Sequence, residues 1–198
     1  MKIETEKLNL DKQVNAESKF ISIIRKRSEE NENSLKLLYE KKLFGTAVSI
    51  LRQELDSMVR VIFISNQSVE DRKNLVSLTL SNQKWKIKNR NITDKEMVEL
   101  SKSLRGWVSY VYNFGCAFIH LSSCHNYEQD DPFLTLNECD KRNISLYMKQ
   151  YHFYQGGLTF EKIANYLPDV FNKIKSNLWL YLKDLEQNFL NENYKINL

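Results

Sequence analysis

The chain has 198 residues, of which 42% are hydrophobic and 27% are charged, and its formal net charge is +4. Only 5 Gly and 2 Pro are present. This scarcity argues against β-sandwich and dinucleotide-binding folds, which need many turn glycines, and it favours long helices. The mild excess of positive charge permits a nucleic-acid ligand without requiring one.

The cysteines and the start of the chain bear on its compartment. The 3 cysteines are an odd number without a repeated spacing, and the first residues contain no apolar segment typical of a signal peptide. No window of 18 apolar residues is present that could cross a bilayer. The sequence therefore predicts a cytoplasmic protein with reduced thiols and no membrane segment.

The first third of the chain predicts helices. Residues 12–29 form a polar helix with a thin apolar stripe, which ends in the basic cluster Arg25–Arg27. Residues 34–65 form one long helix or a pair broken at Gly45, because apolar residues recur there at intervals of three and four. Residues 69–81 form a shorter helix.

A basic segment follows and is the only good strand candidate, because charged and apolar residues alternate in it. In a strand the four cations share one face. These are Lys84, Lys86, Lys88 and Arg90. Clustered cations beside the aromatic ring of Trp85 predict a nucleic-acid-binding segment that contacts phosphates. The alternative is a solvated hairpin that Trp85 and Ile87 anchor to the core.

The next helix opens at Thr93, because Thr93 and Glu96 have the spacing of a capping box. Beyond Gly106 this helix becomes apolar on every side as far as Ile119, which predicts the central, surrounded helix of a bundle. A polar loop over residues 126–138 then leads away from it.

Two further helices complete the prediction. One covers residues 139–153 and is stopped by the glycines at 156–157, and the last begins near Pro168. We expect an all-α fold of about 60% helix or more, a four- to six-helix bundle with at most one short β-hairpin near residues 83–92. A single domain covers residues 1–198, with 1–33 as a peripheral N-terminal helix and 34–190 as the core bundle.

The end of the apolar helix, where two histidines occur, is the main candidate for a catalytic site. His120 follows an apolar stretch and precedes a polar one, so it is placed to titrate near neutrality and act as a general acid or base. The alternative is a histidine whose ring nitrogens bond a neighbouring helix. His125 could assist His120 or simply be solvated.

A metal site is disfavoured at the same place. Asn113, Cys116, His120 and Cys124 lie at helical spacings and could share one face. Structural zinc sites, however, usually draw close Cys or His pairs from loops and need four ligands, and no spacing supports a fourth here. We expect no metal and no cofactor, and both cysteines serve as small core residues.

Charged residues interrupt the apolar helix over 34–65. Arg52, Asp56 and Arg60 are separated by four residues each, which predicts a solvent-facing ladder of ion pairs. The alternative is that Glu54 or Arg60 points inward toward the helix that carries His120.

The chain resembles the HEPN superfamily, small all-helical domains of prokaryotic defence and toxin–antitoxin systems. The resemblance rests on the helix Arg52-Gln-Glu-Leu-Asp-Ser-Met-Val-Arg60, on the helix that ends Asn113-Phe-Gly-Cys-Ala-Phe-Ile-His120, and on the amphipathic C-terminal helix. It covers about residues 40–190. It implies a helical bundle that acts on RNA.

The same resemblance implies a catalytic set. Active HEPN proteins cut RNA with an Arg and a His, and His120 matches the His. Asn113 stands where the Arg belongs and cannot supply its fixed positive charge. Either Arg60 or Arg105 substitutes for it in space, with His125 assisting, or the domain is an inactive, degenerate ribonuclease.

Two functions from different classes follow. The first is an RNA-directed HEPN-like domain, metal-independent if it is an endoribonuclease, with RNA, a homodimer partner and a protein such as an antitoxin as expected partners. The second is a non-catalytic helical module for protein–protein interaction or dimerisation, suggested by the many aromatics after residue 146. A basic RNA-binding adaptor without turnover is a third, weaker option.

Overall fold

The computed structural model describes residues 2–196, including the side chains of residues 15–192. Residues 1, 197 and 198 of the predicted domain lie outside this range. The protein is 77% helical, so the predicted all-α fold with one short hairpin is confirmed. The elements are α1 (Lys2–Glu40), α2 (Phe44–Ser65), α3 (Val69–Leu80), β1 (Lys86–Ile87), β2 (Arg90–Asn91), α4 (Asp94–Leu104), α5 (Val108–Ile119), the 3-10 turn η1 (Ser123–Asn126), α6 (Pro132–Thr135), α7 (Glu138–His152), α8 (Phe160–Ala164) and α9 (Leu167–Ile196).

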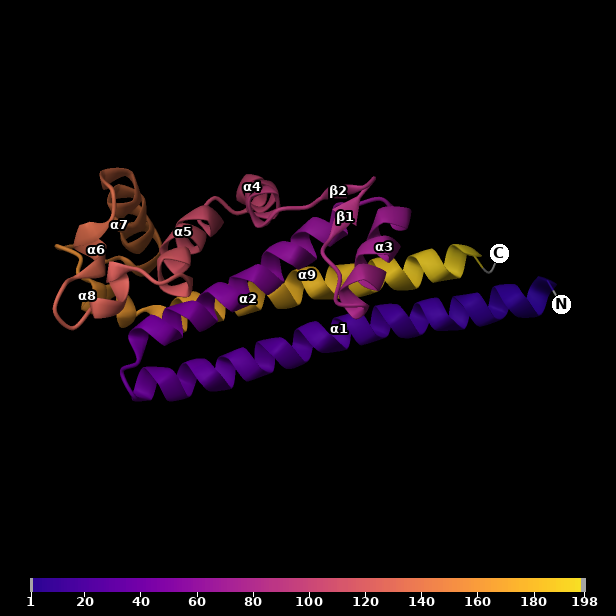
Figure 1. Ribbon diagram of the computed structural model, residues 1–198, viewed down its shortest axis with the longest axis horizontal. Helices are drawn as coiled ribbons and strands as arrows, with labels where there is room; N and C mark the ends of the chain where they lie inside the picture. The colour runs from indigo at the N-terminus through magenta and orange to yellow at the C-terminus, as the bar shows by residue number, and fades with distance from the viewer. Residues whose placement is uncertain (1, 197–198) are drawn as a thin grey trace.

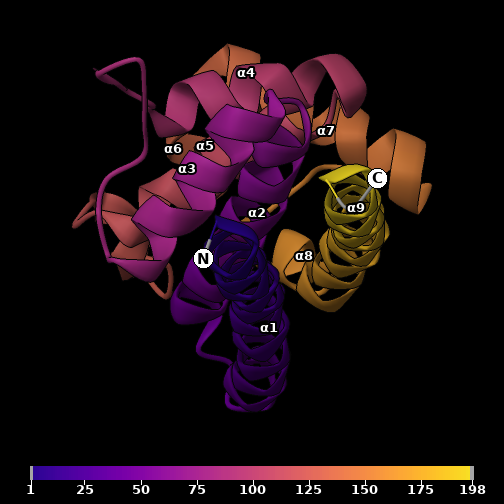
Figure 2. The ribbon, with the colours of Figure 1, turned by 90° about the vertical axis from the view of Figure 1, so that its right-hand side faces the viewer.

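Three long helices define the long axis of the molecule. α1 runs antiparallel to α2 and α9, and the start of α1 lies at the same end as the finish of α9 (Figure 1). Seen from that end, α1 and α9 lie on one side of α2, and α4 and α5 lie on the other (Figure 2). None of the helices within residues 2–196 combines the length and the apolar character that a membrane span requires.

The central helix of the bundle is α2, which contacts α1, α3, α4, α5 and α9. Its apolar stripe is fully buried, as the side chains of Val48, Leu55 and Ile62 show. The prediction that residues 107–119 form the surrounded helix is wrong. One side of α5 meets solvent, because Ile119 is 47% exposed and Tyr110 is only half-buried. A tyrosine can bury its ring and keep its hydroxyl wet, so apolar composition alone overstates burial.

Helix boundaries also differ from the prediction. α1 is continuous through the predicted helix end at residue 29 and the boundary at residue 33, and turns only after Glu40. No Gly or Pro interrupts residues 30–33, and the polar Asn31 is buried there because its amide donates to Glu54. The predicted break at Gly45 is displaced to the turn before Phe44, where Lys42 has a φ of 57°.

The predicted helix from Thr93 to the histidines is two helices. The hydroxyl of Thr93 accepts the N–H of Glu96 and so caps α4, as expected. The chain then leaves the helix at Arg105 and starts α5 at Val108. The carboxylate of Glu96 also binds Arg90 of the hairpin.

The basic segment is a hairpin rather than one strand. Lys86 pairs with Asn91 and Ile87 with Arg90 in antiparallel register. The turn between them has φ values of 48° and 63° at Lys88 and Asn89, the left-handed geometry of a two-residue hairpin loop. The prediction that four cations share one face of a strand is therefore wrong, because the chain reverses direction after Lys88.

α2 and α5 approach closely at Gly115. A Cβ at this position would lie 2.8 Å from Cβ and 3.1 Å from Cδ of Arg52. The first of these atoms is rigidly attached to the α2 backbone, so the contact cannot relax by a side-chain rotation. Gly115 therefore sets the distance between the central helix and α5.

This close approach predicts the effect of adding one methyl group. Gly115→Ala should lower the free energy of unfolding, because overpacking costs roughly 1–3 kcal/mol and exceeds the gain of about 1 kcal/mol that Ala brings to a helix. Chemical denaturation measures the difference. The matched control is Gly106→Ala, since nothing lies within 4 Å of a Cβ there. Equal stability of the two variants would contradict the close approach.

Candidate functional site

The predicted catalytic histidine lies on the surface. His120 is the first residue after α5, and its side chain is exposed, as is that of Asn113. Within residues 15–192 no hydrogen bond or ion pair involves the His120 ring. His120 is therefore neither a packing residue nor a base held by a described partner.

The two candidate cations lie away from His120. The hydroxyl of Ser49 donates to the Phe118 carbonyl, which places the end of α5 beside the first half of α2. At a rise of 1.5 Å per residue, Arg60 is about 16 Å further along α2. Arg105 lies before the opposite end of α5 and donates to the Tyr181 hydroxyl. The structure does not bring the predicted Arg–His pair together.

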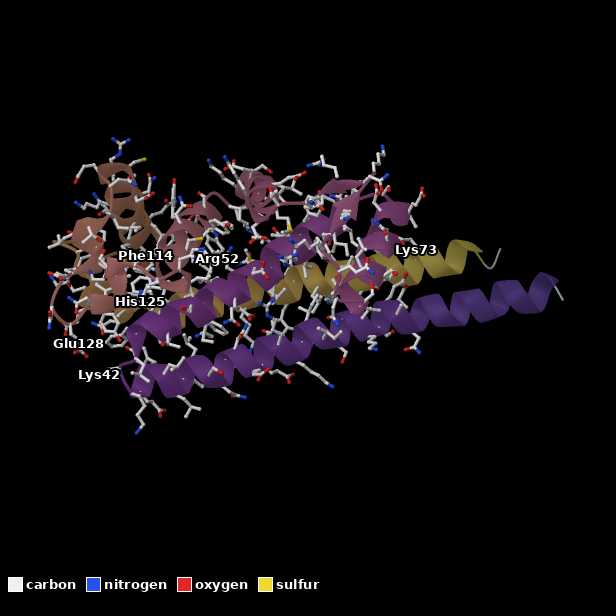
Figure 3. The ribbon with its side chains drawn as sticks, viewed as in Figure 1. Lys42, Arg52, Lys73, Phe114, His125 and Glu128 are labelled. Atoms are coloured by element: carbon white, nitrogen blue, oxygen red, sulfur yellow. The ribbon has the colours of Figure 1, made fainter. Side chains whose placement is uncertain are left out.

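His125 holds a local turn. Its Nδ1 lies 3.1 Å from the carbonyl oxygen of Ser122 and accepts the Ser122 N–H at 3.4 Å, which closes the capping box of η1. Its ring packs on Phe118 at 6.1 Å between centroids. Figure 3 shows His125 near Phe114, at the end of the molecule where Lys42 joins α1 to α2. Because Nδ1 is engaged in the turn, His125 has a structural role.

The cysteines near these histidines do not form a cluster. Cys124 is buried, Cys116 is half-buried and Cys139 is exposed, and all three are free. Within the described residues no group of three or more His, Cys, Asp or Glu side chains could hold a metal ion.

The charged row of α2 faces several neighbours rather than water, so the predicted solvent-facing ladder is only partly right. Asp56 does pair with Arg60 at 3.0 Å. Arg52 is 5% exposed, and its guanidinium lies 3.9 Å above the ring of Tyr112 on α5. Glu54 is fully buried against α1. The expected alternative, that Glu54 or Arg60 faces the His120 helix, is therefore wrong, and the charge that faces this helix is Arg52.

Glu54 is held by neutral partners. Its carboxylate accepts hydrogen bonds from the Ser28 hydroxyl at 2.5 Å and from the Asn31 amide at 2.9 Å. A buried carboxylate is costly unless it is hydrogen-bonded, so these bonds fix the register of α1 on α2. Ser28 and Asn31 are polar residues on the buried side of α1 for this reason.

A pocket of about 650 Å³ opens beside the second half of α2, which contributes Ser57 and Arg60 to its lining. α1 forms one wall with Phe20 and Ile24, and the segment around the hairpin forms the other with Trp85 and Ile92. Arg27, Arg60 and Lys84 bring positive charge to its lining. Of the residues predicted to act chemically, the pocket thus brings together Arg60, Lys84 and Trp85.

Ion pairs organise one side of this pocket. Arg27 binds Asp56 at 3.1 Å, and Arg60 binds both Asp56 at 3.0 Å and Asp94 at 3.2 Å. The guanidinium of Arg52 reaches Asp94 at 3.8 Å. Three guanidiniums thus share two carboxylates, but Arg52 does not line the pocket. The charged residues of the lining are Arg27, Arg60, Lys84 and Asp94.

The predicted nucleic-acid-binding segment divides into anchors and free cations. Trp85 is buried, and its indole N–H donates to the Thr79 hydroxyl at 2.8 Å, so it anchors the hairpin. Arg90 forms a bidentate pair with Glu96 at 2.7 and 2.8 Å, which holds the pKa of that carboxyl below its usual value. Lys84, Lys86 and Lys88 are exposed, and within residues 15–192 none of them has an ion pair.

Sequence reasoning missed several residues of this pocket. The sequence shows Arg27 only as part of a basic cluster at the end of a predicted helix, and no pattern in it indicates a contact between Arg27 and α2. Asn82, Gln83 and Asn91 flank the hairpin and line the pocket. Amides in a turn are ordinary, so only the folded arrangement distinguishes them. The basic cluster Arg25–Arg27 was the one available signal.

Comparison with protein-family models, with curated proteins and with solved structures found no match to this chain. The structure and its chemistry therefore carry the functional argument.

A second group with perturbed protonation lies between α5, α7 and α9. The Lys173 ammonium is 3.2 Å from the ring centroid of Tyr151 and about 5 Å from those of Trp107 and Tyr147. Its nitrogen is buried without a hydrogen-bond acceptor among the described residues. Burial, assisted by the charge of Arg105, lowers the pKa of Lys173 to about 8.

This shift predicts a pH dependence of stability. Above about pH 8 the folded protein loses the Lys173 proton, whereas the unfolded chain keeps it up to the ordinary value of 10.5. Because the unfolded state then binds more protons, the Lys173 contribution to the free energy of unfolding rises with pH from about 8 upward. Denaturation curves at pH 7 and 9.5 for the parent and Lys173→Met measure this contribution. Parallel pH profiles of the two proteins would refute it.

Proposed function

We propose that this protein binds RNA, without cleaving it, through the cationic hairpin surface, defined as Lys84, Lys86 and Lys88 together with the adjoining pocket. The observation that carries the proposal is the set of three exposed lysines, which have no ion pair among residues 15–192, beside a pocket lined by Arg27, Arg60 and Lys84 and by one carboxylate, Asp94. Cations free of carboxylate partners release counterions from a phosphate backbone, which is the main source of affinity for nucleic acids.

The arrangement around His120 supports binding rather than hydrolysis. Stabilising a developing phosphorane charge requires a cation fixed beside the acid–base residue. Both Arg60 and Arg105 are engaged elsewhere, with carboxylates and with Tyr181. A degenerate HEPN-like domain, which keeps RNA contact and lacks the catalytic arginine, is consistent with this geometry. Its setting in a prokaryotic defence or toxin–antitoxin system is part of the same proposal.

A protein partner is supported by a separate observation. Leu121 is 98% exposed and follows Ile119, which is 47% exposed, and Phe153 is 85% exposed. Large apolar side chains in contact with water are stabilised when another protein covers them. We propose that this end of the molecule contacts a second copy of the chain or an antitoxin-like protein. The three free cysteines agree with a reducing, cytoplasmic location.

The proposal predicts the effect of removing the three lysine charges. The triple variant Lys84→Gln, Lys86→Gln, Lys88→Gln should bind single-stranded RNA more weakly. It should also reduce the slope of log affinity against log salt by about 2, because each lost phosphate contact on a single strand contributes about 0.7. Fluorescence anisotropy across a salt series measures both quantities.

A matched control carries the same loss of charge elsewhere. The control is the triple variant Lys41→Gln, Lys149→Gln, Lys183→Gln, whose side chains are exposed away from the hairpin. It should keep the parent salt slope. Equal slopes for both triple variants would show that binding follows net charge alone and would remove the hairpin from the interface.

His120 provides the test against nuclease activity. We expect the parent protein to bind RNA without cleaving it, and His120→Ala to leave both affinity and melting temperature unchanged, because the ring is exposed and without described partners. Incubation with labelled RNA without metal measures cleavage. Cleavage by the parent that falls about 10²–10⁴-fold in His120→Ala would identify a general acid–base and overturn the non-catalytic proposal.

A further inference from the structure

The pocket beside the hairpin differs from a simple cationic groove. It has a volume of about 650 Å³, which lies within the usual range for sites that enclose a small organic group. A surface that contacts only phosphates needs no such volume. The pocket is therefore large enough to receive part of a ligand rather than merely to lie beside it.

The walls of the pocket have the chemistry of a site for a flat, polar ring. Phe20 and Ile24 of α1 supply an apolar wall, and Ile92 lines the opposite side. Arg60 is fixed by Asp56 and Asp94, and its guanidinium lies 5.1 Å from the Trp85 ring centroid. A guanidinium plane held in this way is a stacking surface for a nucleobase.

Three carboxamides line the pocket and have unused hydrogen-bonding groups. Asn82, Gln83 and Asn91 are exposed, and none of their side-chain amides forms a hydrogen bond within the described part of the chain. Each amide offers both donors and an acceptor. The edge of a nucleobase presents donors and acceptors side by side, so this trio matches a base better than it matches a phosphate or an aliphatic group.

The positions of the cations indicate where the backbone of a bound RNA would lie. Lys84 lines the pocket, and Lys86 and Lys88 follow it along the hairpin outside the lining. Arg27 lies on the lining supplied by α1. A backbone that follows the lysines brings one nucleotide to the pocket, where its base can leave the strand and its phosphate can remain with Lys84.

We infer that the pocket binds one unpaired base of a single-stranded RNA whose backbone lies on the cationic hairpin surface. The inference rests on the proposed function and adds that the ligand must offer a base free of pairing. A duplex keeps its bases stacked and paired, and extruding one costs free energy. The protein thus selects single strands over duplexes of the same sequence.

The test compares three ligands and two variants by fluorescence anisotropy at one salt concentration. The ligands are a single-stranded RNA decamer, its perfect duplex, and the decamer with every base removed. The parent should bind the decamer at least about tenfold more tightly than either of the other two, because both lack a free base. The double variant Gln83→Ala, Asn91→Ala should lose about tenfold in decamer affinity and keep its salt slope, since no charge changes.

The matched control is Gln155→Ala, Asn172→Ala, which removes the same two residue types from exposed positions outside the pocket. It should bind the decamer as the parent does. Equal binding of all three ligands, or an unchanged affinity in the pocket variant, would overturn the base site while salt-dependent RNA binding stood. Absence of binding to every ligand would overturn the proposed function as well.

A further measurement with mononucleotides tests whether the pocket binds a base within an RNA strand or a free nucleotide. Adenosine and uridine monophosphates, titrated by calorimetry, should bind far more weakly than the decamer because they cannot reach the hairpin lysines. A mononucleotide that binds as tightly as the decamer would overturn the assignment of an RNA strand.

Discussion

The structure depends on one constraint, which is that charged side chains on the most buried helix must find partners. α2 lies among five other helices and still carries Arg52, Glu54, Asp56 and Arg60. An unpaired charge in such a place is strongly destabilising, whereas a hydrogen-bonded or paired one is tolerated. Glu54 and Asp56 bind α1, Arg52 and Arg60 reach Asp94 of α4, and Arg52 also packs on Tyr112 of α5. Together these contacts connect α1, α4 and α5 to α2.

The same constraint produces the pocket. Asp56 needs cations, and it takes them from α1 through Arg27 and from α2 itself through Arg60. Arg60 then reaches Asp94 at the start of α4, directly after the hairpin. The burial of Trp85 anchors the hairpin to the bundle. A space remains between α1 and the hairpin, and its lining contains the cations Arg27, Arg60 and Lys84 and the carboxylate Asp94.

The two chemically interesting regions are consequently separate. His120 directly after α5 and His125 in η1 lie near the turn between α1 and α2. The hairpin lies beside the second half of α2 and contacts α3, the helix of Lys73 in Figure 3. No described cation of the hairpin side can reach His120, since about 16 Å of helix intervenes. The proposed base site and the proposed partner contact therefore lie on different surfaces of one small bundle.

The sequence by itself determined the all-α class, the Thr93 cap and the positions of most helices, because these follow from local periodicity and the scarcity of Gly and Pro. It also located the basic segment. Only the tertiary structure decided that Trp85 is an anchor, that Arg52 is buried on Tyr112, and that Arg27 meets Asp56. These depend on which helices touch, and a pattern that repeats along one helix cannot specify the partner on another.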